Sequence, residues 1–203
     1  MEYKAQYQEY LLQATAALDA ASARFLPEES EVCRAARYSL LGGGKRIRAI
    51  LTLSVCDMLG GEMQVAAQFA AAVEMLHCYS LIHDDLPCMD DDEYRRGRLT
   101  NHKVFGEALA LLAGDALLTL AFEVMLEQKN VPAEALIETV REVAMCAGNF
   151  GMVGGQVIDL DSEGRQISEE ELRKLHAGKT GALFIAAVRS LSLIHISEPT
   201  RPL

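Results

Sequence analysis

The hydrophobic positions recur with the spacing of α-helices along most of the chain, and no segment alternates in the manner of a β-strand. Proline and glycine mark where the helical pattern stops, as at Pro27 and at Gly42 to Gly44. Ser168 with Glu171 three residues later forms a capping box, which predicts a helix start. The pattern predicts helices over residues 3–26, 29–41, 46–59, 64–83, 104–128, 133–150 and 168–190.

The segment 64–83 is apolar on nearly all sides, with Val65, Phe69, Val73 and Leu76 padded by alanines. A helix without a polar face belongs in the middle of a bundle. The fold class is therefore predicted to be all-α, a bundle of long helices. The length of 203 residues suits one domain with a sizeable core.

The composition of the chain disfavours several classes of binding partner. The formal charge of −10 and the pI of about 5.0 disfavour nucleic acids and anionic membrane surfaces. The most apolar run, residues 104–126, contains Glu107, Asp115 and Glu123, which favours a buried helix over a membrane span. The N-terminus lacks the apolar region of a secretory signal, and the five scattered cysteines form no CxxC pair. These features predict reduced thiols and a cytoplasmic protein.

The stretch "IHDDLPCMDDDEYRRGR" (residues 82–98) directly follows the apolar segment and contains six acids within ten residues. Pro87 disfavours a helix at this point, so the chain can turn and bring Asp84 and Asp90 together. Clustered carboxylates favour a hard cation, and incomplete coordination favours Mg²⁺ with a bound phosphate. Arg95 and Arg96 are suited to hold that anion. A solvated acidic loop is the structural alternative.

The stretch "LGGGKRIR" (residues 41–48) predicts a second anion site, since Lys45, Arg46 and Arg48 have no acid nearby in the sequence. Cations at a helix N-terminus oppose the helix dipole unless an anion joins them. A glycine-rich turn before a basic helix start is the alternative. His77 lies about two turns from Asp84 on the same helix, where it can line the cavity or simply pack.

The motifs "GGGKRIR", "HDDLPCMDDDEYRRGR", "GMVGGQVIDLD" and "LHAGKTGALF" resemble those of the trans-isoprenyl diphosphate synthases, most closely the bacterial farnesyl diphosphate synthases. The resemblance implies an isoprenoid-synthase-type bundle of long helices around a central cavity. It also implies two substrates, isopentenyl diphosphate and an allylic diphosphate (dimethylallyl or geranyl), with Mg²⁺ as cofactor. It further implies a homodimer.

The resemblance assigns a role to each matching residue. Asp84 and Asp90 would bind Mg²⁺, with Asp85 in support. Arg95 and Lys179 would contact the allylic diphosphate, with Thr180 beside Lys179 in a helix break between Gly178 and Gly181. The isopentenyl diphosphate site and the cavity wall would be formed by Lys45, Arg48, His77, Arg96, Gln156 and Asp159.

Tyr79 and Ser80 precede Asp84 by just over one helical turn, where a bulky ring would stop a growing chain. In the family, an aromatic residue here together with the Pro87-Cys88 insertion implies a farnesyl (C15) product. The alternative within the family is a geranylgeranyl or other chain-length synthase. Outside that activity, the chain could be a terpene cyclase, against which "GGGKRIR" argues, a non-catalytic partner subunit or an inactive fragment.

The sequence departs from the family after Ser190. Residues 191–203, "LSLIHISEPTRPL", resemble a translated sequencing-library adapter and are interpreted as foreign, so His195 is left out of the site. Residues 1–190 are interpreted as the N-terminal two-thirds of a single synthase domain, without the second aspartate-rich motif of the family. This interpretation predicts little synthase activity, poor folding and an exposed apolar face for the 203-residue chain.

Overall fold

A computed structural model describes residues 3–196 of the chain, and side chains as far as residue 194. Its helices are α1 (Tyr3–Phe25), α2 (Glu31–Leu40), α3 (Ile47–Leu59), α4 (Met63–Asp84), α5 (Asn101–Phe105), α6 (Glu107–Leu126), α7 (Ala133–Ala147), α8 (Met152–Ser162), α9 (Glu169–Leu175), the π-helix η1 (His176–Gly181) and α10 (Ala182–Ile196). The only strands within residues 3–196 are β1 (Tyr94–Arg95) and β2 (Arg98–Leu99). The predicted all-α class is confirmed.

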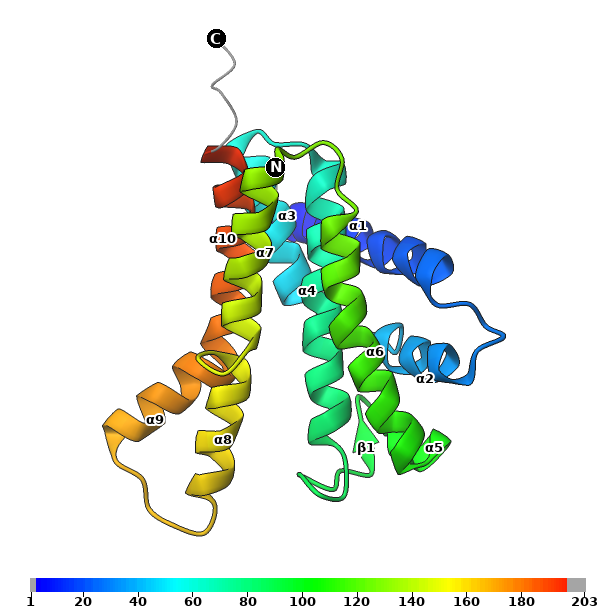
Figure 1. Ribbon diagram of the computed structural model, residues 1–203, viewed down its shortest axis with the longest axis vertical. Helices are drawn as coiled ribbons and strands as arrows, with labels where there is room; N and C mark the ends of the chain where they lie inside the picture. Colours follow the sequence, from blue (N-terminus) through cyan, green and yellow to red (C-terminus); the bar gives the residue numbers. More distant parts are fainter. Residues whose placement is uncertain (1–2, 197–203) are drawn as a thin grey trace.

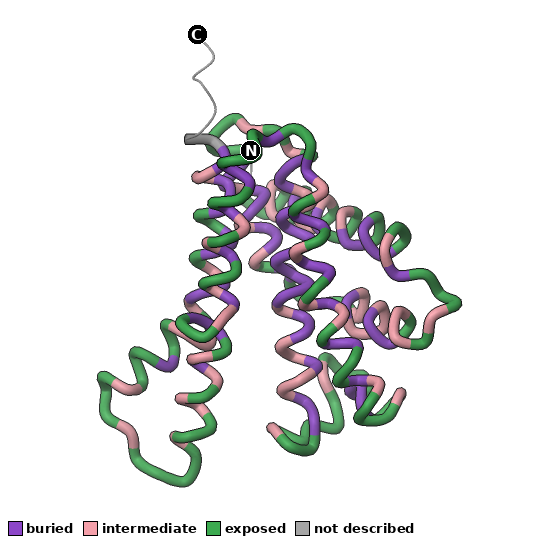
Figure 2. The backbone as a smooth tube through the Cα atoms, viewed as in Figure 1, coloured by how far each residue is buried: buried purple, intermediate pink, exposed green. Residues whose placement is uncertain are grey.

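Helix α4 is the centre of the bundle (Figure 1), packed against α1, α3, α6 and α10. Its side chains Phe69, Met75 and Leu76 are fully buried, as expected for a helix that is apolar on all sides. Figure 2 shows that buried positions concentrate along α4 and the helices facing it, whereas the loop between α8 and α9 is exposed. Figure 1 also shows α8 and α9 on one side of the lower half of the molecule and α4 with α6 on the other.

The short hairpin was not anticipated from the sequence. Tyr94 pairs with Leu99 and Arg95 with Arg98, antiparallel. The turn between them has positive φ at both Arg96 (53°) and Gly97 (75°), the geometry of a type I′ turn. Strands of two residues are too short to give an alternating pattern, which is why the sequence did not reveal them.

Glycines also divide two of the expected helices. Gly106, with φ of 86°, separates α5 from α6 inside the segment expected to be one helix over 104–128. The expected helix over 133–150 ends at Ala147, and the chain starts again as α8 beyond Gly151. A Cβ on Gly151 would lie 1.9 Å from the carbonyl oxygen of Cys146, so this break between the two helices requires glycine.

The capping box at the start of α9 is confirmed, since the Glu171 amide donates to Ser168 Oγ (3.2 Å) and the Ser168 amide to Glu171 Oε2 (2.9 Å). The expected break at Lys179 and Thr180 differs from the structure. The chain stays helical from α9 through η1 into α10, but widens into one turn of π-helix. Such turns occur mostly at functional sites.

Helix α10 continues through the start of the segment interpreted as foreign, and Leu191 and Ile194 are buried against the core. Residues 197–203 and the side chain of His195 lie outside the described part of the structure. The interpretation of the tail stays a prediction.

Three helical stretches of the described chain are long and apolar enough, by length and composition alone, to cross a membrane: Met63–Asp84, Glu107–Leu126 and Glu169–Ile194. In the first, 72% of the most apolar window is buried among the other helices, compared with 44% and 39% in the other two. The expected absence of a membrane span therefore stays a prediction.

Candidate active site

A cavity of about 380 Å³ lies between the C-terminal half of α4 and the pair formed by α8 and η1. Its polar lining comes from four elements that are far apart in the sequence. Its walls are otherwise apolar, with Leu81, Met89, Met152 and Val157 among them. The site residues expected from the sequence that line it are Arg48, His77, Tyr79, Ser80, Asp84, Gln156, Lys179 and Thr180.

The chain turns back at the end of α4, as Pro87 predicted. Helix α4 ends at Asp84, and the backbone amide of Asp90 donates to the carbonyl oxygen of Asp84 (2.8 Å). The two carboxyl groups lie close enough to interact. Burial raises the pKa of Asp84 to about 6, and the charge of Asp90 adds to this while Lys179 opposes it.

Asp84 and Asp90 suit Mg²⁺ by chemistry, because both offer carboxylate oxygens and a bound cation would relieve their repulsion. Within the described residues, no group of three or more His, Cys, Asp or Glu side chains is arranged to hold a metal. An ion at this site would therefore take its remaining ligands from water and from the phosphate oxygens of a substrate.

Asp85 does not line this cavity. It is buried, and its Oδ1 accepts from Arg95 Nε (2.7 Å) with Arg95 Nη2 at 2.6 Å. Arg95 also approaches Asp92 (3.4 Å). The arginine expected to contact the allylic diphosphate is thus held by carboxylates in this structure, next to the metal-binding candidates.

On the opposite wall, α8 and η1 meet backbone to backbone. A Cβ on Gly155 would lie 2.0 Å from the backbone nitrogen of Lys179, so only glycine permits this approach. The Lys179 ammonium pairs with the carboxylate of Asp159. Burial lowers the pKa of Lys179, but Asp159, Asp84 and Asp90 outweigh it and raise the pKa overall. The Nε2 of Gln156 is buried without a hydrogen-bond partner, as expected of a donor that awaits a ligand.

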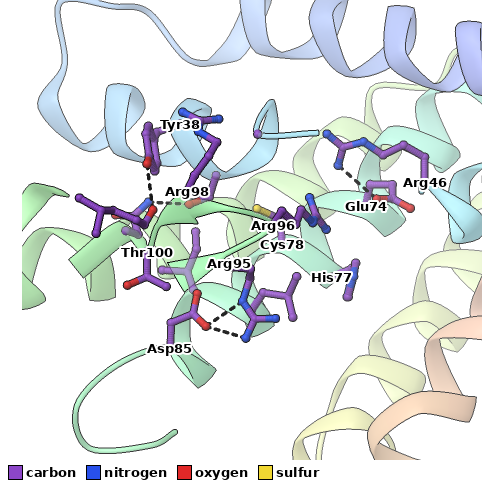
Figure 3. A pocket seen from close by; sticks show the side chains of 16 residues that line it. Tyr38, Arg46, Glu74, His77, Cys78, Asp85, Arg95, Arg96, Arg98 and Thr100 are labelled. Carbon is purple, nitrogen blue, oxygen red and sulfur yellow. Dashed lines mark hydrogen bonds and ion pairs between the residues drawn. The ribbon is translucent and has the colours of Figure 1, made fainter. Parts of the chain in front are cut away.

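A second, smaller pocket of about 40 Å³ lies beside the hairpin (Figure 3). Arg46, Arg95, Arg96 and Arg98 line it, and His77 lines both this pocket and the larger cavity. Burial and the surrounding arginines, Arg48 and Arg96 first among them, lower the pKa of His77 to about 3. His77 is therefore neutral near pH 7 and can donate or accept a hydrogen bond without adding charge.

Arg48 enters the large cavity from α3 and lies over the ring of Phe184, 4.7 Å from its centroid. Burial lowers the pKa of Arg48, and its Nε has no hydrogen-bond partner. A half-buried guanidinium with an unused donor is suited to bind an anion.

The expected lack of acids near the basic loop is wrong for Arg46. Its Nη1 lies 3.4 Å from Oε2 of Glu74 on α4, and both side chains are buried. Glu74 is the one acid of α4 before Asp84 at its end, and this isolation is the sequence signal that could have indicated a buried partner. Lys45 is exposed and lies outside the lining of both pockets.

Tyr79 is buried at the wall of the cavity, with its ring edge-on to that of His83 (5.7 Å between centroids). Nε2 of His83 lies 3.0 Å from the carbonyl oxygen of Leu111 on α6. A Cβ on Gly114 would lie 2.1 Å from that nitrogen, so α6 leaves room for the His83 ring only because residue 114 is glycine. Ser80 lines the cavity beside Tyr79.

Comparison with known proteins assigns this arrangement to a family. Residues 29–201 match the family model described as polyprenyl synthetase. The chain belongs to the polyprenyl synthetase family. The resemblance to trans-isoprenyl diphosphate synthases drawn from the sequence motifs is thereby confirmed.

Two curated relatives and one solved structure illustrate the kinds of enzyme that the chain is similar to. A geranylgeranyl diphosphate synthase of Cyanophora paradoxa is 54% identical over 160 residues, which are 78% of this chain and 53% of that protein. A farnesyl diphosphate synthase of Micrococcus luteus is 47% identical over 171 residues, 84% of this chain and 58% of that protein. The crystal structure of a geranyltransferase from Legionella pneumophila superposes with a TM-score of 0.90 at 36% identity, covering 94% of this chain and 68% of that one. The polyprenyl synthetase chain spans about half the length of the curated relatives that it matches.

Within this polyprenyl synthetase fold, the expected site residues fall into three groups. Eight line the large cavity, and Asp85, Arg95 and Arg96 line the small pocket together with His77. Lys45, Asp90 and Asp159 line neither pocket, although Asp90 and Asp159 interact with cavity residues through Asp84 and Lys179.

Proposed function

We propose that the protein to which this chain belongs is a trans-prenyl diphosphate synthase that condenses isopentenyl diphosphate with dimethylallyl or geranyl diphosphate, and that the 203-residue chain by itself has little of this activity. The observation that supports this most directly is the composition of the large cavity. Carboxylate and ammonium groups lie at one end (Asp84, Lys179), and Arg48 with neutral His77 lies at the other, with apolar walls between them. Two anionic head groups and a hydrocarbon chain match this distribution.

The acidic end is suited to the allylic diphosphate. Asp84 and Asp90 would hold Mg²⁺, which when bound would neutralise the diphosphate as it leaves. Lys179 adds a positive charge on the facing wall, and Arg95, if released from Asp85, adds another. The allylic C–O bond breaks with both electrons on the diphosphate oxygen.

The cationic end is suited to isopentenyl diphosphate. Arg48 offers an unused guanidinium donor, Arg96 lies at the adjoining pocket, and neutral His77 stands between them. The double bond of isopentenyl diphosphate would attack the allylic carbon, and a proton would leave to the released diphosphate. The apolar walls exclude the water that would otherwise capture the cation.

We propose a farnesyl product, with Tyr79 as the floor that stops chain growth. A geranylgeranyl product is the second candidate, since relatives carry both names. In a version of the chain extended to the length of its relatives, Tyr79→Ala should enlarge the cavity and shift products towards C20, whereas Tyr94→Ala, which changes an exposed tyrosine outside the cavity, should not. Chromatography of the dephosphorylated products measures this; the same product distribution in both variants would refute the role of Tyr79.

We also propose a homodimer and a cytoplasmic location. Leu111 and Leu112 on α6 are about half exposed, as is Ile137 on α7, and an apolar helix face of this kind suits an interface. Cys33, Cys78, Cys88 and Cys146 are free thiols, which fits a reducing compartment. Light scattering of wild type and Leu112→Lys tests the dimer, and a monomeric wild type would rule it out.

The experiment that tests the function uses a thio analogue of geranyl diphosphate, whose allylic bond to the diphosphate does not break. Its binding is measured by calorimetry with and without Mg²⁺. We expect Mg²⁺ to strengthen binding, and Asp84→Asn combined with Asp90→Asn to abolish that gain. Asp115→Asn, which removes an exposed acid on α6, is the matched control and should behave as wild type. Binding of the analogue that does not respond to Mg²⁺ in the wild-type chain would contradict the proposal.

A further inference from the structure

Glu74 is a fully buried acid whose two carboxylate oxygens contact two different groups at the start of α3, the side chain of Arg46 and the backbone amide of Ala49. Its Oε2 lies 3.4 Å from Nη1 of Arg46, and its Oε1 accepts from the backbone amide of Ala49 at 3.2 Å. The side chain is 2% exposed and that of Arg46 is 6% exposed. Neither residue has a role in the proposed chemistry.

The Ala49 amide is the third of α3, one of the donors that a helix leaves without a partner at its N-terminus. Arg46 precedes the helix and offers it no side-chain cap. Glu74 therefore supplies the cap from α4, 25 residues away in the sequence, and its negative charge also complements the helix dipole. The start of α3 is thereby fixed to the central helix.

Arg46 also stabilises the loop between α2 and α3 through a contact of its own side chain. Its backbone is left-handed (φ of 48°), which is unfavourable for a residue with a side chain, and its Nη2 donates to the carbonyl oxygen of Leu40 at 2.6 Å. The guanidinium thus links the end of α2 to Glu74 across the glycines 42–44. Figure 3 shows its pairing with Glu74. Without a charge opposite Arg46, only the hydrogen bond to Leu40 would remain to hold the strained backbone in place.

The residues placed by this arrangement are the cations on either side of Arg46. Lys45 precedes it, and Arg48 reaches the large cavity from the first turn of α3. His77 lies three residues after Glu74 on α4, so the same helix holds the loop and lines the site. We propose that Glu74 is a positioning residue, which through Arg46 and the Ala49 amide sets the place of Arg48 for the isopentenyl diphosphate head group.

Stability alone does not account for the pair. Replacing a buried ion pair by apolar side chains of similar size is often neutral or stabilising, whereas removal of one partner is costly. This difference gives a test. The double variant Glu74→Leu with Arg46→Met leaves no unpaired charge, so it should fold, yet it lacks both the cap on Ala49 and the bridge to Leu40.

The inference rests on the proposed function, and the experiment separates the two. Binding of isopentenyl diphosphate and, with Mg²⁺, of the thio analogue of geranyl diphosphate is measured by calorimetry for wild type, Glu74→Gln and the double variant. We expect the double variant to bind isopentenyl diphosphate about tenfold more weakly, the effect of losing one charge-assisted contact. The analogue should bind within about twofold of wild type. Asp57→Asn, which removes the charge of the group that accepts from Tyr10 near the other end of α3, is the control and should change neither affinity.

Glu74→Gln separates the effect of the hydrogen bond to Ala49 from the effect of the negative charge opposite Arg46. The amide oxygen can still accept from Ala49 while the charge opposite Arg46 is lost, so an intermediate loss of affinity for isopentenyl diphosphate is expected. Wild-type affinity for isopentenyl diphosphate in the double variant would overturn the positioning role. So would an equal loss for both ligands, because that would indicate a general structural defect.

Hydrogen exchange of backbone amides gives a readout that does not depend on the function. Exchange at Arg48 and Ala49 should accelerate in the double variant, while exchange in α6 should stay as in wild type. If the wild-type chain binds neither ligand, the proposed function fails, and the exchange result alone decides the positioning role. Unchanged exchange at Arg48 and Ala49 would then overturn it.

Discussion

The contact between α8 and η1 gives a prediction whose size follows from the structure. A Cβ added to Gly155 would lie 2.0 Å from the Lys179 nitrogen, 2.6 Å from the Gly178 carbonyl carbon and 2.7 Å from the Lys179 Cα. All three are backbone atoms, so no side chain can rotate away. Ordinary contact begins at 3.4 Å, so Gly155→Ala must push the two helices apart by about 1.4 Å.

We expect this displacement to cost about 3 kcal/mol of unfolding free energy, at the upper end of the range for overpacked cores. For a domain of this size that lowers Tm by roughly 6–12 °C. It would also pull Lys179 away from Asp159 and from the acidic end of the cavity.

Urea unfolding followed by circular dichroism at 222 nm measures the change in unfolding free energy. Gly181→Ala is the matched control, because a Cβ there meets only the carbonyl oxygen of His176 at 3.4 Å. That substitution lies in the same turn and should be neutral, or stabilising by about 0.5 kcal/mol through reduced backbone freedom. Equal stability of Gly155→Ala and wild type would show that the backbone contact is not a constraint.

Two further predictions concern the cationic end of the cavity. Phe184→Ala removes the ring under Arg48 and should weaken isopentenyl diphosphate binding about threefold to fivefold, the effect of losing a partly buried cation–π contact. Phe25→Ala, which removes the ring under the surface residue Arg24, is the control and should not weaken binding. Equal affinities of Phe184→Ala and wild type in calorimetry would exclude a role for the Phe184 ring. The pKa of His77 is about 3 in the folded chain and 6.5 in the unfolded chain. As the pH drops below about 6.5, the unfolded chain takes up a proton at His77 and the folded chain does not. The free energy of unfolding therefore falls, by roughly 2 kcal/mol at pH 5. His77→Gln should flatten this slope in urea unfolding between pH 7 and 5, and an unchanged slope would mean that His77 is not buried as a neutral ring.

The sequence predicted the parts of the site that follow from local rules. Pro87 predicted the turn that brings Asp90 back to Asp84, and the apolar run before it predicted a central helix. Both features depend on backbone geometry and on hydrophobic burial over a few neighbouring residues, so they can be read from one segment at a time.

The contacts that the sequence did not reveal join distant segments. The pairing of Glu74 with Arg46 spans 28 residues, and Asp85 at the end of α4 pairs with Arg95, which lies in a strand too short to be recognised from the sequence. The spacing of hydrophobic residues indicates which face of a helix is buried, but it does not indicate which side chains of other segments contact that face. The glycines of His176–Gly181 do not distinguish a helix break from a widened helical turn, because both would contain them.

The π-helical turn has a consequence for how this polypeptide tolerates length changes. Each residue advances an α-helix by about 100°, so a wider turn resets the rotational phase between the helix before it and the helix after it. The buried Leu175 of α9 and the buried Leu183 and Ala187 of α10 lie on either side of this turn. A single-residue deletion within "HAGKTG" can therefore be absorbed by tightening the π turn to an α-helical turn, which leaves the apolar stripe of α10 facing the core. A deletion within α10 itself has no such extra residue to remove and would turn that stripe outward.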